Sequence, residues 1–98
     1  MAIVEVSIVP IGTATTSVSE FVAGAVSVLQ TSGLHYELTA MGTIIEGDLP
    51  TVMETVRAMH ETPFGKGSDR VYTVIKIDDR RDKPTGIGYK LKSVRDKL

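Results

Sequence analysis

The chain has no cysteine and no tryptophan, and aromatic residues make up only 5% of it. The absence of cysteine excludes disulfides, thiolate metal sites and cysteine nucleophiles. No run of about 18 apolar residues occurs, and no basic start precedes an apolar stretch, so we expect neither a transmembrane segment nor a signal peptide. The cytoplasm is therefore the expected compartment.

The chain also has no excess of one charge sign, since its 11 basic and 12 acidic residues give a net charge of −1. So little net charge produces no overall field that attracts nucleic acid or an anionic membrane, and we expect neither as a partner. The length of 98 residues predicts one small domain, residues 1–98, with an adequate but thin core.

Hydrophobic periodicity divides the chain into strands and helices. Alternating apolar positions predict strands over residues 2–10, 34–41, 43–46 and 70–78. Apolar residues at helical spacing predict helices over residues 17–32, 48–62 and 87–98. The two central strands form a hairpin, and Gly42 interrupts the alternation where a tight reversal is needed.

Capping signals mark the ends of the first predicted helix. Ser17 and Glu20 form a Ser-x-x-Glu capping box, and Gly33 stands where a left-handed C-terminal glycine is expected. Gly24 inside the helix costs about 1 kcal/mol relative to alanine. We expect it to mark close packing onto the sheet.

The other two helices have their own end signals. Asp48 is the expected N-cap of the second helix, with Pro50 in the first turn, where its missing N–H does no harm. Pro63 is expected to end this helix. Thr85 is the expected N-cap of the C-terminal helix.

This order of elements predicts an α+β fold. The order βαββαβ usually forms a ferredoxin-like sandwich, with two helices on one face of a four-stranded antiparallel sheet. A C-terminal amphipathic helix follows. Right-handed crossovers are expected to gather loop 10–17, hairpin tip 41–43 and loop 61–70 at one end of the sheet.

Two apolar surfaces of this fold predict self-association. The sheet face away from the helices carries Ile3, Val9, Tyr72 and Val74. The C-terminal helix also has an apolar stripe that needs a cover. A second copy could bury both surfaces, in a homodimer or a homotetramer. The alternative is that the tail folds back over the open sheet face of its own chain.

Few residues have the spacing of a catalytic or metal site, so we predict no catalytic residue and no metal. His60-Glu61 lacks the second histidine of a zinc motif, which favours a polar helix end. An enzyme that uses this pair is the third-ranked hypothesis. The carboxylates of Asp78, Asp79 and Asp82 alternate with arginines, which favours solvated ion pairs over a divalent ion.

A binding pocket is the remaining functional prediction. Hydroxyl-rich loops at one sheet end are expected to form it, with Gly12, Thr13, Ser17 and Thr43 as polar groups and Met41 and Phe64 as apolar walls. Further polar side chains, those of Glu5, Ser7, Glu37 and Thr39, are expected on the open sheet face. The Glu5 carboxylate needs a cation there, which is either a bound positive ligand or Lys76 on the neighbouring strand.

Three segments resemble the thiamine-binding protein family. They are VEVSIVPIGT at residues 4–13, SGLHYELTAMGTIIEG at 32–47 and RVYTVIKIDDRRD at 70–82. The resemblance implies a ferredoxin-like fold, assembly into dimers and tetramers, and binding of thiamine or its pyrimidine portion. No further cofactor is implied.

The favoured function is non-enzymatic binding of thiamine or a hydroxymethylpyrimidine-type precursor, by a carrier or sensor. An aminopyrimidine needs hydrogen-bond donors and acceptors, and a thiazolium cation needs a carboxylate or an aromatic face. The residue types that fit these needs are the candidate ligand-binding residues Glu5, Ser7, Glu37, Thr39, Met41 and Thr43. The rival hypothesis is an assembly or regulatory module that acts through its subunit interface without a small-molecule ligand.

Overall fold

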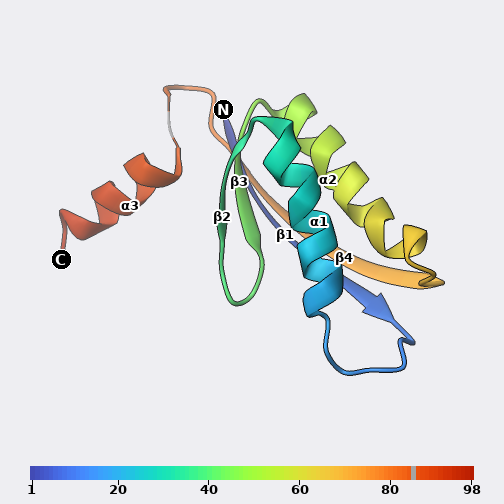
Figure 1. Cartoon of the computed structure of the whole chain (residues 1–98). Coiled ribbons are helices and arrows are strands. Elements are labelled where there is room, and N and C mark those ends of the chain that lie inside the picture. The colour runs from blue at the N-terminus through green and yellow to red at the C-terminus, as the bar shows by residue number, and fades with distance from the viewer. Residues whose placement is uncertain (85) are drawn as a thin grey trace.

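A computed structural model describes residues 1–84 and 86–98. Its elements are β1 (Ala2–Ile11), α1 (Ser19–Ser32), β2 (His35–Leu38), β3 (Thr43–Gly47), α2 (Leu49–Gly65), β4 (Arg70–Asp79) and α3 (Ile87–Arg95). The strands form one antiparallel sheet in the order β2-β3-β1-β4, and α1 and α2 lie side by side on one face (Figure 1). The predicted ferredoxin-like α+β fold is confirmed.

Strand register separates the two faces of the sheet. Val4 pairs with Ile45 on one side and Ile77 on the other, so the row containing all three faces the helices. The buried core lies between this face and the helices, and consists of Ala2, Val4, Val6, Ala25, Leu29, Ile45, Val52, Val56 and Met59. The opposite, open face carries the residues that alternate with these along each strand.

The central hairpin is shorter than predicted. Strands β2 and β3 have four and five residues, whereas β1 and β4 have ten each. The reversal occurs at Thr39–Gly42, where the Thr39 hydroxyl accepts from the amides of Met41 and Gly42 at 3.2 and 3.1 Å. Pairing of β3 with β1 therefore stops at Val6. From Ser7 to Ile11, β1 has a neighbour on the β4 side only.

Gly42 is required by close approach rather than by backbone conformation, since its φ is not positive. A side-chain carbon there would lie 3.1 Å from the carbonyl oxygen of Val6 and 3.4 Å from Cγ of Glu5. Any larger residue would push the hairpin tip away from β1.

The helix ends agree only in part with their sequence signals. Gly33 ends α1 with φ of 78°, and Asp48 is the N-cap residue of α2, as predicted. The predicted capping box is wrong, because α1 begins at Ser19 and the Ser17 hydroxyl contacts that of Ser19 instead. The predicted cap at Thr85 lies outside the described residues.

The prediction that Pro63 ends the second helix is also wrong, because α2 continues to Gly65. Proline cannot donate to the carbonyl four residues earlier, which belongs to Met59. The Thr62 hydroxyl donates to that carbonyl oxygen at 2.7 Å instead. With this acceptor satisfied, the helix passes through a buried proline.

Lys66, after the end of α2, reaches across to α1. Its Nζ donates to the carbonyl oxygen of Glu20 at 2.9 Å and lies 5.9 Å from the centre of the Phe21 ring. A side-chain carbon at Gly24 would lie 2.7 Å from this Nζ. Gly24 therefore allows close packing as predicted, but against Lys66 and not against the sheet.

Among the residues that the structure describes, helix α3 is bonded to the sheet near its start. The Ile87 amide donates to Oε2 of Glu46 at 2.7 Å, and Lys90 forms an ion pair with Asp78. Beyond this point α3 extends away from the other elements (Figure 1). It does not fold back over its own sheet, so Leu91, Val94 and Leu98 remain exposed.

Candidate ligand-binding site

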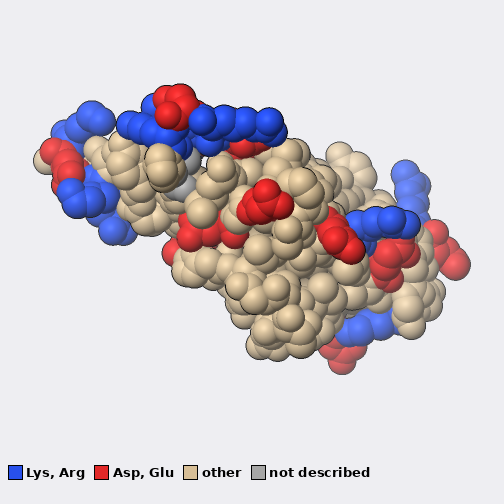
Figure 2. Space-filling view, turned by 90° about the horizontal axis from the view of Figure 1, so that it is seen from above, with Lys and Arg blue, Asp and Glu red and all other residues tan. Residues whose placement is uncertain are grey.

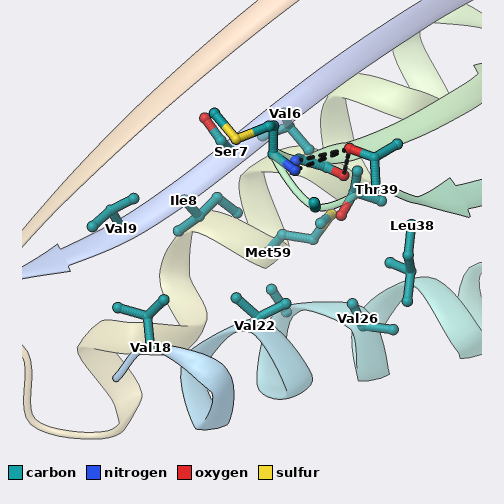
Figure 3. A pocket seen from close by; sticks show the side chains of 15 residues that line it. Val6, Ser7, Ile8, Val9, Val18, Val22, Val26, Leu38, Thr39 and Met59 are labelled. Atoms are coloured by element: carbon teal, nitrogen blue, oxygen red, sulfur yellow. Dashed lines mark hydrogen bonds between the residues drawn. The ribbon is translucent and has the colours of Figure 1, made fainter. Parts of the chain in front are cut away.

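A groove of about 380 Å³ opens where the hairpin stops short, between the free part of β1, the hairpin tip and α1. Its walls are mainly apolar, as Figure 3 shows. The apolar lining comprises Val6, Ile8, Val9, Val18, Val22, Ala25, Val26, Leu38, Ala40, Met41 and Met59. The hydroxyl-bearing lining residues are Ser7, Thr39 and Thr43. A volume of this size is within the usual range for small-molecule sites.

One wall of the groove is a row of valines on α1. Val22 and Val26 are four residues apart and share one face of the helix, and Val18, the residue before α1, continues the row. In Figure 3 the three valines line up opposite Ile8 of β1. Val22 is 43% exposed. A longer hairpin would have covered it, and the short one leaves an apolar surface open to a ligand.

The opposite wall is the free edge of β1. Along an antiparallel strand, alternate residues direct their N–H and C=O groups to each side. Between Ser7 and Ile11 the side away from β4 has no partner strand. This edge therefore offers backbone donors and acceptors beside apolar walls, which suits a flat heterocycle with polar ring atoms.

The three hydroxyl groups of the groove differ in availability. Thr39 uses its hydroxyl within the turn, where it also donates to the Gly42 carbonyl oxygen at 2.9 Å. Thr43 is 7% exposed. Ser7 is half-buried at the free edge, and among the described residues its hydroxyl makes no intramolecular hydrogen bond. The Ser7 side chain is on the open face with Glu5, so its hydroxyl borders the groove at the free edge and does not face the valine wall.

The Glu5 carboxylate lies close to one end of the groove. Glu5 lies two residues before Ser7 on the open face, with its side chain close to the hairpin tip at Gly42. Lys76, directly opposite on β4, has its Nζ 3.4 Å from Oε1 of Glu5. The predicted cross-strand pair is therefore present. The pair is partly exposed, so a cationic ligand can compete for the carboxylate.

The six sequence-predicted residues fall into two groups. Ser7, Thr39, Met41 and Thr43 line the groove, whereas Glu5 and Glu37 lie on the open face. Oε1 of Glu37 lies 3.8 Å from Nε2 of His35. The Glu5 side chain lies beside the hairpin tip, with Cγ 3.4 Å from the place of a side-chain carbon at Gly42.

The predicted single pocket at the loop end is wrong. Gly12 and Thr13 line a separate cavity with Lys66, because the short hairpin ends well before the loops that join the long strands. Phe64 packs edge-on against the His60 ring, with ring centres 5.6 Å apart. The sequence reasoning also missed the α1 valines, although their four-residue spacing was readable.

His60 has a structural role between α2 and β4. Its Nδ1 lies 2.7 Å from the Thr73 hydroxyl oxygen. The groove does not include His60, although the neighbouring Met59 lines it.

The charged run after β4 forms the predicted ion pairs. Arg80 donates to both carboxylate oxygens of Asp82 at 2.6 and 2.9 Å, and this contact lowers the pKa of Asp82 to about 2. Arg81 likewise donates to Asp79 and lowers the pKa of that carboxyl. Two of the three carboxylates are therefore paired with arginines, and the third, that of Asp78, forms an ion pair with Lys90.

None of the described helices has the length and apolarity to cross a membrane.

Comparison with known proteins identifies the family. The family described as "Thiamine-binding protein" matches residues 4–95. A UPF0045 protein of Methanothermobacter thermautotrophicus is 46% identical over 99 residues and 100% of both chains. The UPF0045 protein YqgV of Bacillus subtilis is 49% identical over 102 residues, 100% of this chain and 98% of that protein. The chain belongs to the thiamine-binding protein family.

A solved structure agrees with this assignment. The hypothetical protein MJ1052 of Methanocaldococcus jannaschii is 39% identical and superposes with a TM-score of 0.89. The match covers 97% of this chain and 96% of that chain. The family resemblance of the three sequence segments is thus confirmed over nearly the whole chain.

Proposed function

We propose that this protein binds thiamine or a hydroxymethylpyrimidine-type precursor without converting it. The observation that carries the proposal is an apolar groove beside an unpaired strand edge, in a chain of the thiamine-binding protein family. The aminopyrimidine ring lies in the groove, and the thiazolium ring extends past Ser7 toward Glu5.

The groove suits the pyrimidine half of the ligand. Val18, Val22 and Val26 supply an apolar wall for the flat ring face. The free edge of β1 supplies backbone donors and acceptors for the ring nitrogens and the amino group, and the Ser7 hydroxyl lies beside this edge on the open face. No charged side chain lines the groove among the described residues, which suits a neutral ring.

The carboxylate of Glu5 suits the cationic half. A thiazolium ring in place of the Lys76 ammonium keeps Glu5 paired and frees Lys76 to remain in water. A precursor without the thiazolium ring makes the groove contacts only. The two halves of the ligand therefore depend on different residues.

The groove offers binding without chemistry. Its hydroxyls have no histidine or carboxylate base beside them within the lining, so none is activated as a nucleophile. We therefore assign the protein as a non-enzymatic carrier or sensor of the vitamin in the cytoplasm, with no further cofactor.

Titration calorimetry of the full chain tests this function, with thiamine, hydroxymethylpyrimidine and the isolated thiazole alcohol as separate ligands. We expect saturable heat with the first two, and a rise in melting temperature that grows with ligand concentration. The thiazole alcohol alone is expected to bind weakly. Absence of heat and of any thermal shift with both pyrimidine compounds at millimolar concentration would refute the function.

Self-association is the second part of the proposal, as a homodimer or homotetramer. The open sheet face exposes Val9, Tyr72 and Val74, which is unfavourable in an isolated chain. If association proved to be the whole function, the protein would be an assembly module whose groove stays empty. The calorimetric experiment distinguishes these possibilities.

A further inference from the structure

Basic residues are concentrated at one end of the chain. Residues 80–98, here called the C-terminal arm, hold 7 of the 11 basic residues and only 2 of the 12 acidic ones. The arm therefore has a net charge of +5, and residues 1–79 have −6. Figure 2 shows the basic side chains gathered at the arm end of the molecule. The chain thus has a strongly electropositive region although its total charge is close to zero.

The basic side chains of the arm surround a cavity of about 360 Å³, here called the arm cavity. It lies between the end of β4, with the residues that follow it, and one face of α3. Its lining consists of Asp78, Arg80, Lys83, Tyr89, Lys90, Ser93, Val94 and Lys97. Four cations and one carboxylate give this lining a net charge of +3. Because a cavity lined by charges of one sign concentrates ions of the opposite sign, the arm cavity attracts anions.

The spacing of basic residues along α3 places only some of them at the cavity. Each residue advances about 100° around a helix, so Lys90 and Lys97, in the turn that follows α3, lie on the same side as Tyr89. Lys92 and Arg95 fall on the opposite side by the same spacing, and neither lines the cavity. The arm therefore contains basic residues of two kinds, which substitutions can separate.

Lys83 and Lys97 supply positive charge that is not used in the ion pairs of the described residues. Lys83 is positioned by Tyr89, because its Nζ donates to the phenol oxygen at 2.8 Å and lies 5.0 Å from the centre of the ring. The same contact lowers the pKa of the Tyr89 hydroxyl. An ammonium group has three donors, so two of those of Lys83 remain for an anion.

The other two cations of the lining form exposed ion pairs. Arg80 donates to Asp82 through Nε and Nη2, and the two N–H groups of its Nη1 make no hydrogen bond with the described residues. Lys90 pairs with Asp78, and both side chains are more than half exposed. Exposed pairs of this kind contribute little to stability, so an anion with several charges can compete for these cations.

We propose that the arm cavity binds a small soluble molecule through two linked phosphate groups. A single phosphate ester carries a charge of about −1.5 to −2 at pH 7, so a diphosphate balances the net charge of +3 better than a monophosphate does. Lysine and arginine side chains are the usual protein ligands of phosphate oxygens. The hydroxyls of Tyr89 and Ser93 add neutral donors to the same lining.

Two features favour a small molecule over nucleic acid or a membrane. The cations surround a cavity, which admits a compact group and not a duplex or a bilayer. An extended polyanion that approaches the arm also meets residues 1–79, whose net charge of −6 repels it. The linings of the arm cavity and of the groove at the hairpin tip share no residue, so the inference is independent of thiamine binding.

Titration calorimetry of the full chain with inorganic pyrophosphate tests the site, at an ionic strength of about 0.15 M, where charges more than about 8 Å away are largely screened. Lys83→Gln/Lys97→Gln removes two cations of the lining and is expected to raise the dissociation constant at least about tenfold. Lys92→Gln/Arg95→Gln is the matched control, because it removes the same charge from the arm outside the lining. It should change the dissociation constant less than about twofold.

Two further measurements separate geometry from total charge. Tyr89→Phe keeps the net charge and removes the hydroxyl that positions Lys83, so it is expected to weaken pyrophosphate severalfold. Inorganic orthophosphate should bind the unmodified chain at least about tenfold more weakly than pyrophosphate, because it has one phosphate group in place of two. Circular dichroism checks that each variant is folded.

Three outcomes would overturn the inference. The first is the absence of saturable heat with pyrophosphate at millimolar concentration. The second is equal loss of pyrophosphate binding in the two double variants, which would reduce the arm to a diffuse positive surface. The third is tighter binding to duplex DNA or phosphatidylserine vesicles than to pyrophosphate, weakened equally by both double variants, which would assign the arm to an anionic surface. Thiamine binding is measured in phosphate-free buffer and read separately.

Discussion

Replacing Glu5 with glutamine separates the two halves of the proposed ligand. The substitution keeps the size and the hydrogen-bonding capacity of the side chain, and removes only its charge. Because Glu5 lies on the open face and outside the groove lining, the groove itself is unchanged. We expect weaker binding of thiamine and unchanged binding of hydroxymethylpyrimidine.

The size of the loss follows from the exposure of the carboxylate. A hydrogen bond to a buried charged group contributes about 1.5–3 kcal/mol. The Glu5 side chain is 37% exposed, so solvent screening reduces this contribution to about 1 kcal/mol. The dissociation constant for thiamine should therefore rise about fivefold to tenfold. The free energy of unfolding should change little, since an exposed ion pair contributes at most about 1 kcal/mol.

Lys76→Met is the reciprocal variant. In the proposed binding mode, the Lys76 ammonium, whose Nζ lies 3.4 Å from Oε1 of Glu5, competes with the thiazolium ring. Its removal should tighten thiamine binding severalfold and leave the neutral pyrimidine unaffected. In the double variant with Glu5→Gln, the gain should disappear, because no carboxylate remains for the cation.

Titration calorimetry at one fixed ionic strength measures all four proteins against both ligands. Equal losses for thiamine and hydroxymethylpyrimidine in Glu5→Gln would refute the division of the ligand between groove and carboxylate. Unchanged thiamine binding in the same variant would place the thiazolium ring elsewhere.

Three further predictions concern the groove and its support. Thr62→Val should lower the free energy of unfolding in urea by about 1–2 kcal/mol, because the Met59 carbonyl loses its donor. Thr55→Val is the control: the Thr55 hydroxyl donates to the Thr51 carbonyl within a regular part of the helix, so its loss should cost less than about 0.5 kcal/mol. Gly42→Ala should displace the hairpin tip, destabilising the chain by about 1 kcal/mol and weakening both ligands. Val22→Ser should weaken thiamine and hydroxymethylpyrimidine equally, about threefold to tenfold by calorimetry, with little change in melting temperature because Val22 is largely exposed.

Periodicity predicted the fold well because the two faces of the sheet differ in composition. The alternation of Val4 and Val6 with Glu5 and Ser7 fixes which side of β1 meets the helices. The order of strands and helices then leaves few topologies open. Local signals were enough for these features.

Strand lengths were less predictable, and the site depends on them. The apolar alternation continues through Met41, yet the Thr39 hydroxyl bonds to the following amides and ends β2 at Leu38. The sequence pattern does not show that this local turn is more stable than two further residue pairs between the strands would be. The resulting gap forms the groove, which Ser7, Met41 and Thr43 line, whereas the sequence predicted Ser7 on the open face and the other two in a pocket at the loop end.

Helix ends show the same limit. Pro63 is a strong stop signal, and only the three-dimensional position of the Thr62 hydroxyl reveals why α2 continues. Gly24 leaves room for the Lys66 side chain, and Lys66 is distant from it in sequence. Contacts of this kind have no local signature.

The position of β1 at the centre of the sheet has a consequence for synthesis. Its long neighbour, β4, begins only at Arg70, so about 3–12 s of translation separate the two strands at about 5–20 residues per second. Every residue that lines the groove precedes His60. All residues of the groove therefore leave the ribosome before β4, and a ligand of the proposed class bound at that stage would stabilise the incomplete domain.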